Sequence, residues 1–167
     1  MNLSQFIEWL ATNPKLNFTI AIIGLFLAIF FYIKSKKVKL PYYAISSQNI
    51  VRDLVSRIDS LEMLYAGERI ENLTATKIAF WNAGNDTIKR EDIPDKAPLT
   101  INVKKGYKIL NAIILHFIEK SNEFSIHISD DKSHITIDFE YLDKNEGVII
   151  QLLHTGRSEQ VLKLVVK

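Results

Sequence analysis

The stretch that decides the fold is "NEFSIHISDDKSHITIDFEYLD", residues 122–143. Apolar and polar residues alternate strictly on both sides of Asp130–Ser133, a run of residues that favours a turn. If Ser129 pairs with His134, all the apolar residues fall on one face; they are Phe124, Ile126, Ile128, Ile135, Ile137, Phe139 and Tyr141. A slip by one residue would destroy this arrangement. The stretch therefore predicts an antiparallel hairpin with one buried face.

The same two-residue period and the same turn spacing extend through residues 42–167. Further strands are predicted at 42–51, 61–67, 74–82, 98–103, 107–118, 147–154 and 161–167. About eight or nine short strands with turns every 8–12 residues are typical of an all-β antiparallel sandwich. Segments 107–118 and 147–154 are apolar at nearly every position, so we expect central strands, covered on both sides or supporting a partner contact. Segment 49–61 also fits one face of a helix, and we expect a loop or short helix there.

Ahead of this domain, residues 16–33 contain no charged side chain and are dominated by Ile, Leu and Phe. A membrane-spanning helix needs about 17–25 such residues, so the segment predicts a single transmembrane helix. A cleaved signal peptide is the competing interpretation. It is disfavoured because no basic residue precedes Lys15 and the run ends in Phe-Phe-Tyr-Ile-Lys, which suits cleavage badly.

Basic residues flank this segment unequally and predict its orientation. Lys34, Lys36, Lys37 and Lys39 lie in the linker 34–41, whereas Lys15 on the other side is offset by Glu8. The positive-inside rule then places the N-terminus outside and the domain in the cytoplasm, at the inner membrane of a bacterial cell. The same four lysines are predicted to attract anionic lipid headgroups at the membrane surface.

Two features of the N-terminal part suggest further contacts. Residues 1–14 place Leu3, Phe6, Ile7 and Leu10 on one side of a short amphipathic helix, which predicts a segment lying on the bilayer or, alternatively, a frayed terminus. Gly24 and Ala28 form a small-xxx-small pair in the predicted span. Such pairs allow close helix packing and thus a homodimer, although small residues are also common in spans for no such reason.

The segment "FWNAGNDTIKREDIP" (80–94) is the first candidate for ligand binding. Trp81 would act as a stacking platform, with Asn82 and Asn85 as polar reading groups. The alternative is a tight connection in which the Asn side chains satisfy backbone groups. His154 is a further candidate, with the end of a strand as its alternative role.

The polar face of the hairpin offers weak candidate metal ligands. In the register above, His127 faces Thr136, with His134 and Asp138 as diagonal neighbours. Two imidazoles and a carboxylate suit zinc, but a surface hydrogen bond or ion pair between His127 and Asp138 is the simpler interpretation. We expect no cofactor, and no catalytic motif such as G-x-S-x-G, H-E-x-x-H or a P-loop is present.

Composition narrows the possible functions. Of the 21 Lys and Arg, five lie in residues 1–39, which contain one acidic residue; the remaining 16 basic and 18 acidic residues leave a nearly neutral domain. Nucleic acid binding needs a concentrated basic face and is not expected. The absence of Cys excludes thiol chemistry, thiolate metal sites and disulfides.

In outline, a single span followed by a predicted β-sandwich resembles single-pass proteins that carry an immunoglobulin-like domain, although the chain has no Cys…Trp…Cys pattern. The sequence predicts a membrane-anchored, cytoplasmic binding, sensor or protein-interaction module whose partner is a protein or small ligand. The alternative is a structural domain facing the cell envelope. A metal-dependent enzyme using His127, His134 and Asp138 is a minor third hypothesis.

Overall fold

The computed structural model describes residues 2, 4–5, 9, 12–51, 62–158 and 162–165. The chain divides into two compact units, Met1–Lys37 and Val38–Lys167. The four apolar positions of the predicted amphipathic segment 1–14 lie outside the described residues. So does 52–61, which covers most of the segment predicted as a loop or short helix.

The first unit contains helix α2 (Pro14–Ser35). Asn13 caps its start by accepting a hydrogen bond from the Leu16 amide at 3.4 Å, and Pro14 occupies the first turn, where its missing amide proton is no loss. The helix ends where Lys36 turns to extended backbone. Among the described residues, α2 is the one helix long and apolar enough to cross a membrane.

The second unit consists mostly of antiparallel β-structure, as predicted. One four-stranded sheet has the order β1 (Pro41–Val51), β4 (Leu73–Asn82), β11 (Gly147–His154), β7 (Ile109–Phe117). A second has the order β12 (Leu162–Val165), β6 (Thr100–Val103), β9 (His134–Asp138), β8 (Ser125–Ile128). Two small ladders pair β10 (Tyr141–Leu142) with β5 (Ile88–Lys89), and β2 (Leu64–Tyr65) with β3 (Glu68–Arg69); the 3₁₀ turns are η1 (Arg90–Asp92) and η2 (Lys120–Asn122).

The predicted hairpin register is confirmed. β8 and β9 pair His127 with Thr136, and the backbone amide of Ser129 donates to the carbonyl of His134 at 3.0 Å. The turn between them places Lys132 at φ 56°, in the left-handed region. The strand is shorter than predicted, because β9 ends at Asp138 and the chain then leaves for the separate β10–β5 ladder.

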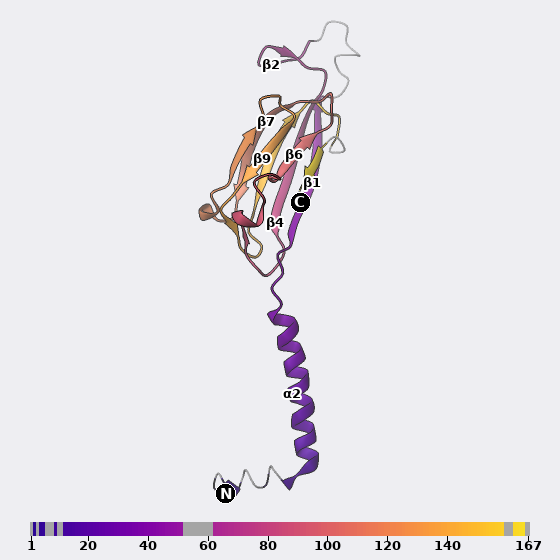
Figure 1. Ribbon diagram of the computed structural model, residues 1–167. Helices are drawn as coiled ribbons and strands as arrows, with labels where there is room; N and C mark the ends of the chain where they lie inside the picture. The colour runs from indigo at the N-terminus through magenta and orange to yellow at the C-terminus, as the bar shows by residue number, and fades with distance from the viewer. Residues whose placement is uncertain are drawn as a thin grey trace. The chain divides into compact units, whose positions relative to one another are not determined.

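The prediction of two central strands is half right. β11 lies between β4 and β7, as expected, but β7 is an edge strand (Figure 1). Several of its apolar side chains are consequently exposed to solvent, including Ile113, Leu115 and Phe117. The nearly continuous apolar run in segment 107–118 therefore does not mean that the strand is covered on both sides.

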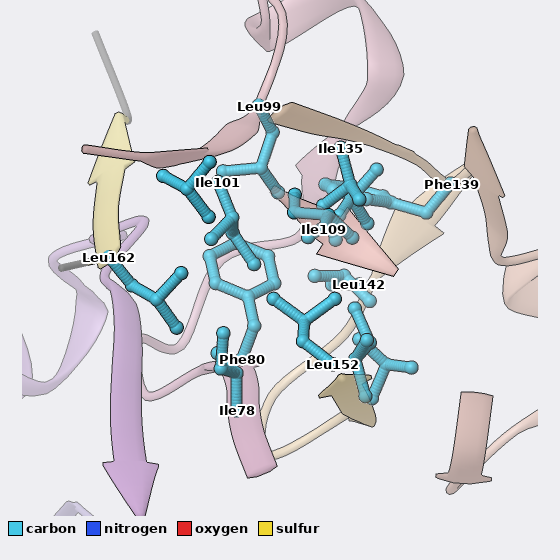
Figure 2. Packing of buried hydrophobic residues seen from close by; sticks show 14 of the residues in the cluster. Ile78, Phe80, Leu99, Ile101, Ile109, Ile135, Phe139, Leu142, Leu152 and Leu162 are labelled. Atoms are coloured by element: carbon cyan, nitrogen blue, oxygen red, sulfur yellow. The ribbon is translucent and has the colours of Figure 1, made fainter. Parts of the chain in front are cut away.

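The two four-stranded sheets share one hydrophobic core (Figure 2). On β4, Ile78 and Phe80 point inward while Lys77 points outward, following the alternation of strand side chains. Their neighbours come from both sheets and from the connecting segments: Ile88, Leu99, Ile101, Val103, Ile109, Ile135, Ile137, Phe139, Leu142, Val148, Ile150, Leu152 and Leu162. The inward face of β4 is polar at its two ends, where Thr74, Thr76 and Asn82 are buried.

Candidate functional site

The residues predicted to bind a ligand do not form one site. Trp81 and Asn82 are adjacent on β4, so their side chains lie on opposite faces of the sheet. Gly147, at one end of β11, pairs with Trp81, whereas His154 at the other end pairs with Thr74. Trp81, Asn82 and His154 therefore lie at different places on the sheet and cannot contact one ligand together.

Trp81 is half-buried on the outer face of the first sheet, the face turned away from the core. Its ring lies 6.0 Å from that of Tyr42, centroid to centroid, at an interplanar angle of 39°. Tyr42 and Trp81 are direct cross-strand partners on β1 and β4. The two rings form an aromatic pair of the kind that stabilises a sheet face.

Asn82 is fully buried and its amide is used within the domain. Its Nδ2 donates to the carbonyls of Asp86 at 2.7 Å and Leu142 at 3.0 Å. Its Oδ1 accepts from the backbone amides of Gly84 at 2.9 Å and Leu40 at 3.4 Å. Asn82 therefore satisfies backbone groups, which was the alternative to a role in ligand binding.

Asn85 helps to hold the segment Val38–Leu40, here called the strap, against the loop 82–86. The Asn85 side chain accepts from the Val38 amide at 2.7 Å, and the Asn85 amide donates back to the Val38 carbonyl at 2.9 Å. The amides of Asp86 and Ala83 add bonds to the carbonyls of Val38 and Leu40, at 3.2 Å and 2.8 Å. The partner of the predicted ligand loop is therefore the chain's own strap.

Gly84 permits this close approach. A Cβ atom at Gly84 would lie 2.0 Å from the Val38 carbonyl oxygen and 2.7 Å from the Leu40 nitrogen. Both neighbours are backbone atoms and cannot yield as a flexible side chain would. Any residue with a side chain at this position would push the strap away from the loop.

An ion pair between Lys39 and Asp92 also connects the strap to η1. Lys39 Nζ lies 2.7 Å from both carboxylate oxygens of Asp92, and the Lys89 amide donates to Asp92 Oδ2 at 2.7 Å. The bond to Lys39, followed by that from Lys89, lowers the pKa of Asp92, while the bond to Asp92 raises the pKa of Lys39. Lys39, predicted to lie on the membrane surface, is thus engaged within the domain.

His154 belongs to a buried polar network at the other end of the sheet. Its Nε2 lies 2.8 Å from Thr76 Oγ1, and Thr76 Oγ1 lies 2.6 Å from Ser47 Oγ. The amide of Gly156 donates to His154 Nδ1 at 3.1 Å. Burial away from water lowers the pKa of His154 to about 4, so the ring is neutral at physiological pH.

The hairpin residues predicted as weak metal ligands have other neighbours. Asp138 pairs with Arg90 at 3.2 Å from Nε, and His134 Nδ1 lies 3.0 Å from Ser133 Oγ. His127 is exposed. In the described ranges, no group of three or more His, Asp or Glu side chains is arranged to hold a metal ion.

In the first unit, Lys34 and Lys36 lie over aromatic rings of α2, with Nζ 5.9 Å from the centre of Phe30 and 5.0 Å from that of Tyr32. Lys37 follows directly after them. A Cβ at Gly24 would meet nothing within 4 Å, so the Gly24/Ala28 side of the helix is open. The predicted homodimer through it stays a prediction.

Sequence reasoning found the turn residues of the 82–86 loop but not their partner. Asn82, Gly84 and Asn85 indicate a tight backbone arrangement. Nothing in the sequence indicates that their partner is the strap, more than forty residues upstream. Asp92 was missed for the same reason. Thr74 and Thr76 lie two residues apart on the same face as Ile78, which indicates polar groups on a buried face, where the network around His154 forms.

Comparisons of this chain with protein-family models, with curated proteins and with solved structures found no match.

Proposed function

We propose that this chain is a single-pass membrane protein whose β-domain, an immunoglobulin-like sandwich, lies in the cytoplasm and serves as a binding module for another protein. The apolar helix α2 supports the anchor. The lysines at and after its C-terminal end support the orientation, since basic residues are retained on the cytoplasmic side. The shared core of the two four-stranded sheets supports the sandwich.

The short connection between anchor and domain supports a role close to the bilayer. The helix ends at Ser35, and the domain begins at Val38 with the hydrogen-bonded strap. Only Lys36 and Lys37 stand between these two points. Three steps of extended chain reach at most about 11 Å, so the domain would be tethered near the lipid headgroups and their negative charge.

The observation that carries the binding role is the exposed apolar edge strand β7. Ile113 and Leu115 are each 44% exposed, Phe117 is 42% exposed, and Ile118, directly after the strand, is 62% exposed. Within β7 there is no Pro and no Lys, Arg, Asp or Glu, the residues that commonly protect an edge from pairing. An edge of this kind accepts an extended segment of another protein as an additional strand, with apolar side chains filling alternate positions.

The environment of His154 supports binding rather than catalysis. Both ring nitrogens are hydrogen-bonded within the domain, and the ring is shielded from solvent. A general base needs a nitrogen that can reach a substrate proton. His154 instead serves the interior of the sheet.

The first test is topology. The full chain, tagged at its C-terminus, is expressed in bacterial cells, and protease is added to spheroplasts and to inverted membrane vesicles. We expect cleavage of the domain in inverted vesicles alone. Cleavage in intact spheroplasts would overturn the cytoplasmic placement and support a domain that faces the envelope.

The second test maps the partner surface. A photo-crosslinking amino acid is placed at Leu115 on β7 and, as the matched control, at Ser46 on the other edge strand β1. We expect a discrete adduct from position 115 alone, whose crosslinked peptide maps to an extended apolar segment of a different protein. Equal adducts from both positions would refute β7 as the binding edge, and an adduct between two copies would replace the partner by a homodimer.

A further inference from the structure

An apolar pocket opens beneath the strap of the second unit. Its volume is about 190 Å³. The lining residues come from the strap, β1, β4, β5, η1 and the segments next to β6 and β9: Lys39, Pro41, Phe80, Ile88, Asp92, Ile93, Ala97, Leu99 and Phe139. All of them belong to the same compact unit.

The inner wall of the pocket is hydrocarbon. Phe80, Leu99 and Phe139 are each 2% exposed, and Ile88 is 6% exposed. The rings of Phe80 and Phe139 lie 6.1 Å apart at an interplanar angle of 41°. Figure 2 shows Phe80 and Phe139 within the core cluster that also contains Leu99.

Among the described residues, the charged groups that line the pocket are Lys39 and Asp92, and they neutralise each other. Lys39 and Asp92 form their two-pronged ion pair there, and their side chains are 38% and 32% exposed, far more than the inner wall. The pair therefore stands at the solvent end of the pocket. A charged ligand would find no unpaired counter-charge inside, and the desolvation of its charge would oppose entry.

We infer that this pocket binds a small, uncharged aromatic molecule about the size of a substituted benzene. An apolar cavity of about 150 Å³ is large enough to hold benzene and stays free of water, and this pocket is of comparable size. The rings of Phe80 and Phe139 contribute aromatic surface to the lining, which favours an aromatic ligand. The pocket adds a ligand site to the proposed protein-binding role and does not depend on the side of the membrane on which the domain lies.

The ion pair links the pocket to the strap and to η1. A ligand that enters between Lys39 and Asp92 would separate the strap from η1 locally, because Lys39 belongs to the strap and Asp92 to η1. The same strap is bonded to the 82–86 loop. A bound ligand would therefore lie against Lys39 of the strap.

The test uses the full chain in lipid nanodiscs with 3-trifluoromethyl-3-phenyldiazirine as a photoreactive probe. Labelled peptides are identified by mass spectrometry after irradiation. We expect labelling of the peptides that contain Ile88, Leu99 and Phe139, with competition by toluene. Labelling confined to α2, which only reports probe dissolved in the lipid, would overturn the inference.

Two variants block the pocket and one serves as the control. Ala97→Leu adds three carbons at a half-buried lining position, and Ile93→Phe enlarges a second half-buried wall, so one variant remains if the other misfolds. Ala79→Leu adds the same three carbons on the outer face of β4, away from the pocket. Pocket labelling should fall to background in both blocking variants and persist in Ala79→Leu; labelling unchanged in a folded blocking variant refutes the site.

Thermal unfolding provides an independent measurement. A ligand that binds only the folded state raises the Tm, so toluene should raise the Tm of the wild type and of Ala79→Leu but not of Ala97→Leu. An equal shift of the Tm in all three proteins would show a solvent or lipid effect and would refute the pocket.

A final experiment uses a phospholipid that carries the phenyldiazirine at the end of its acyl chain. If only this lipid labels the pocket, the inference of a free aromatic ligand is wrong and the ligand is a lipid acyl chain.

Discussion

The ring of His154 donates a buried hydrogen bond to the hydroxyl of Thr76 across a distance of 2.8 Å. The direction of this bond follows from the other ring nitrogen. Because the Gly156 amide donates to Nδ1 at 3.1 Å, Nδ1 carries no proton and Nε2 must carry it. Thr76 in turn can donate to Ser47 Oγ at 2.6 Å, so the bonds run in one direction from β11 through β4 to β1.

Thr76→Val tests this network. The variant keeps the shape of the side chain but removes the acceptor of His154 and the donor to Ser47. A buried polar group left unsatisfied costs about 1–3 kcal/mol, and we expect a loss of that size in the free energy of unfolding. Urea unfolding of the full chain in nanodiscs measures it. Thr136→Val, on the polar face of the hairpin, is the control and should change stability far less.

Stability should depend on pH through His154. Its pKa in the folded domain is about 4, below the ordinary value of 6.5, so the unfolded chain binds the proton more readily. The stabilising contribution is therefore complete above pH 6.5 and is lost as the pH falls toward 4. A difference of this size corresponds to about 3 kcal/mol in the free energy of unfolding.

Urea unfolding of the wild type and of His154→Gln between pH 4 and pH 7 measures this dependence. The slope in this range should be smaller in the variant, while the other three histidines are retained in both chains. Equal slopes would show that another group is responsible. Carboxylates add a separate loss at lower pH, which both chains should share.

Regular alternation made the hairpin predictable. Ile126, Ile128, Ile135 and Ile137 need one common face, and this requirement admits one register, which the structure has. The run around Ile113 was predicted wrongly as a central strand, because an exposed apolar edge strand can have the same composition as a buried strand. Local sequence records the apolar character of a strand but not which neighbours it obtains.

The candidate site was less predictable than the fold. Asn82 and Asn85 were recognisable as turn residues, but which groups they bind depends on the path of residues 38–40, which is a tertiary property. The ion pair of Lys39 with Asp92 spans a similar distance in sequence. His154 was identified individually, whereas its partners required the pairing of three strands.

Removal of Lys39 should raise the pKa of Asp92. In Lys39→Met the largest cause of the lowered pKa is lost, so the value should move toward the ordinary 3.8 and remain below it, because the Lys89 amide still donates to the carboxylate. Carbon-13 NMR of the Asp92 carboxyl group across an acid titration measures this shift. Lys144→Met removes the same charge from an exposed position elsewhere and should leave Asp92 unchanged; an equal shift in both variants would indicate a general charge effect.

Gly84→Ala should release the strap from the domain. The added methyl group would stand 2.0 Å from the Val38 carbonyl oxygen, far inside any tolerated contact, so the strap or the loop must move. The bonds from Asn85 and Ala83 to the strap would then be lost, although the inward side chains of β4 keep their core contacts.

Hydrogen exchange followed by mass spectrometry on the full chain in nanodiscs tests this release. We expect faster exchange of the amides of Val38 and Leu40 in Gly84→Ala, with the protection of β4 and β11 retained. Gly24→Ala adds the same methyl group in open space on α2 and should leave exchange in the strap unchanged. Protection of the strap equal to that of the wild type would mean that the loop absorbs the clash without releasing the strap, and Gly84 would then not control the attachment of the strap to the 82–86 loop.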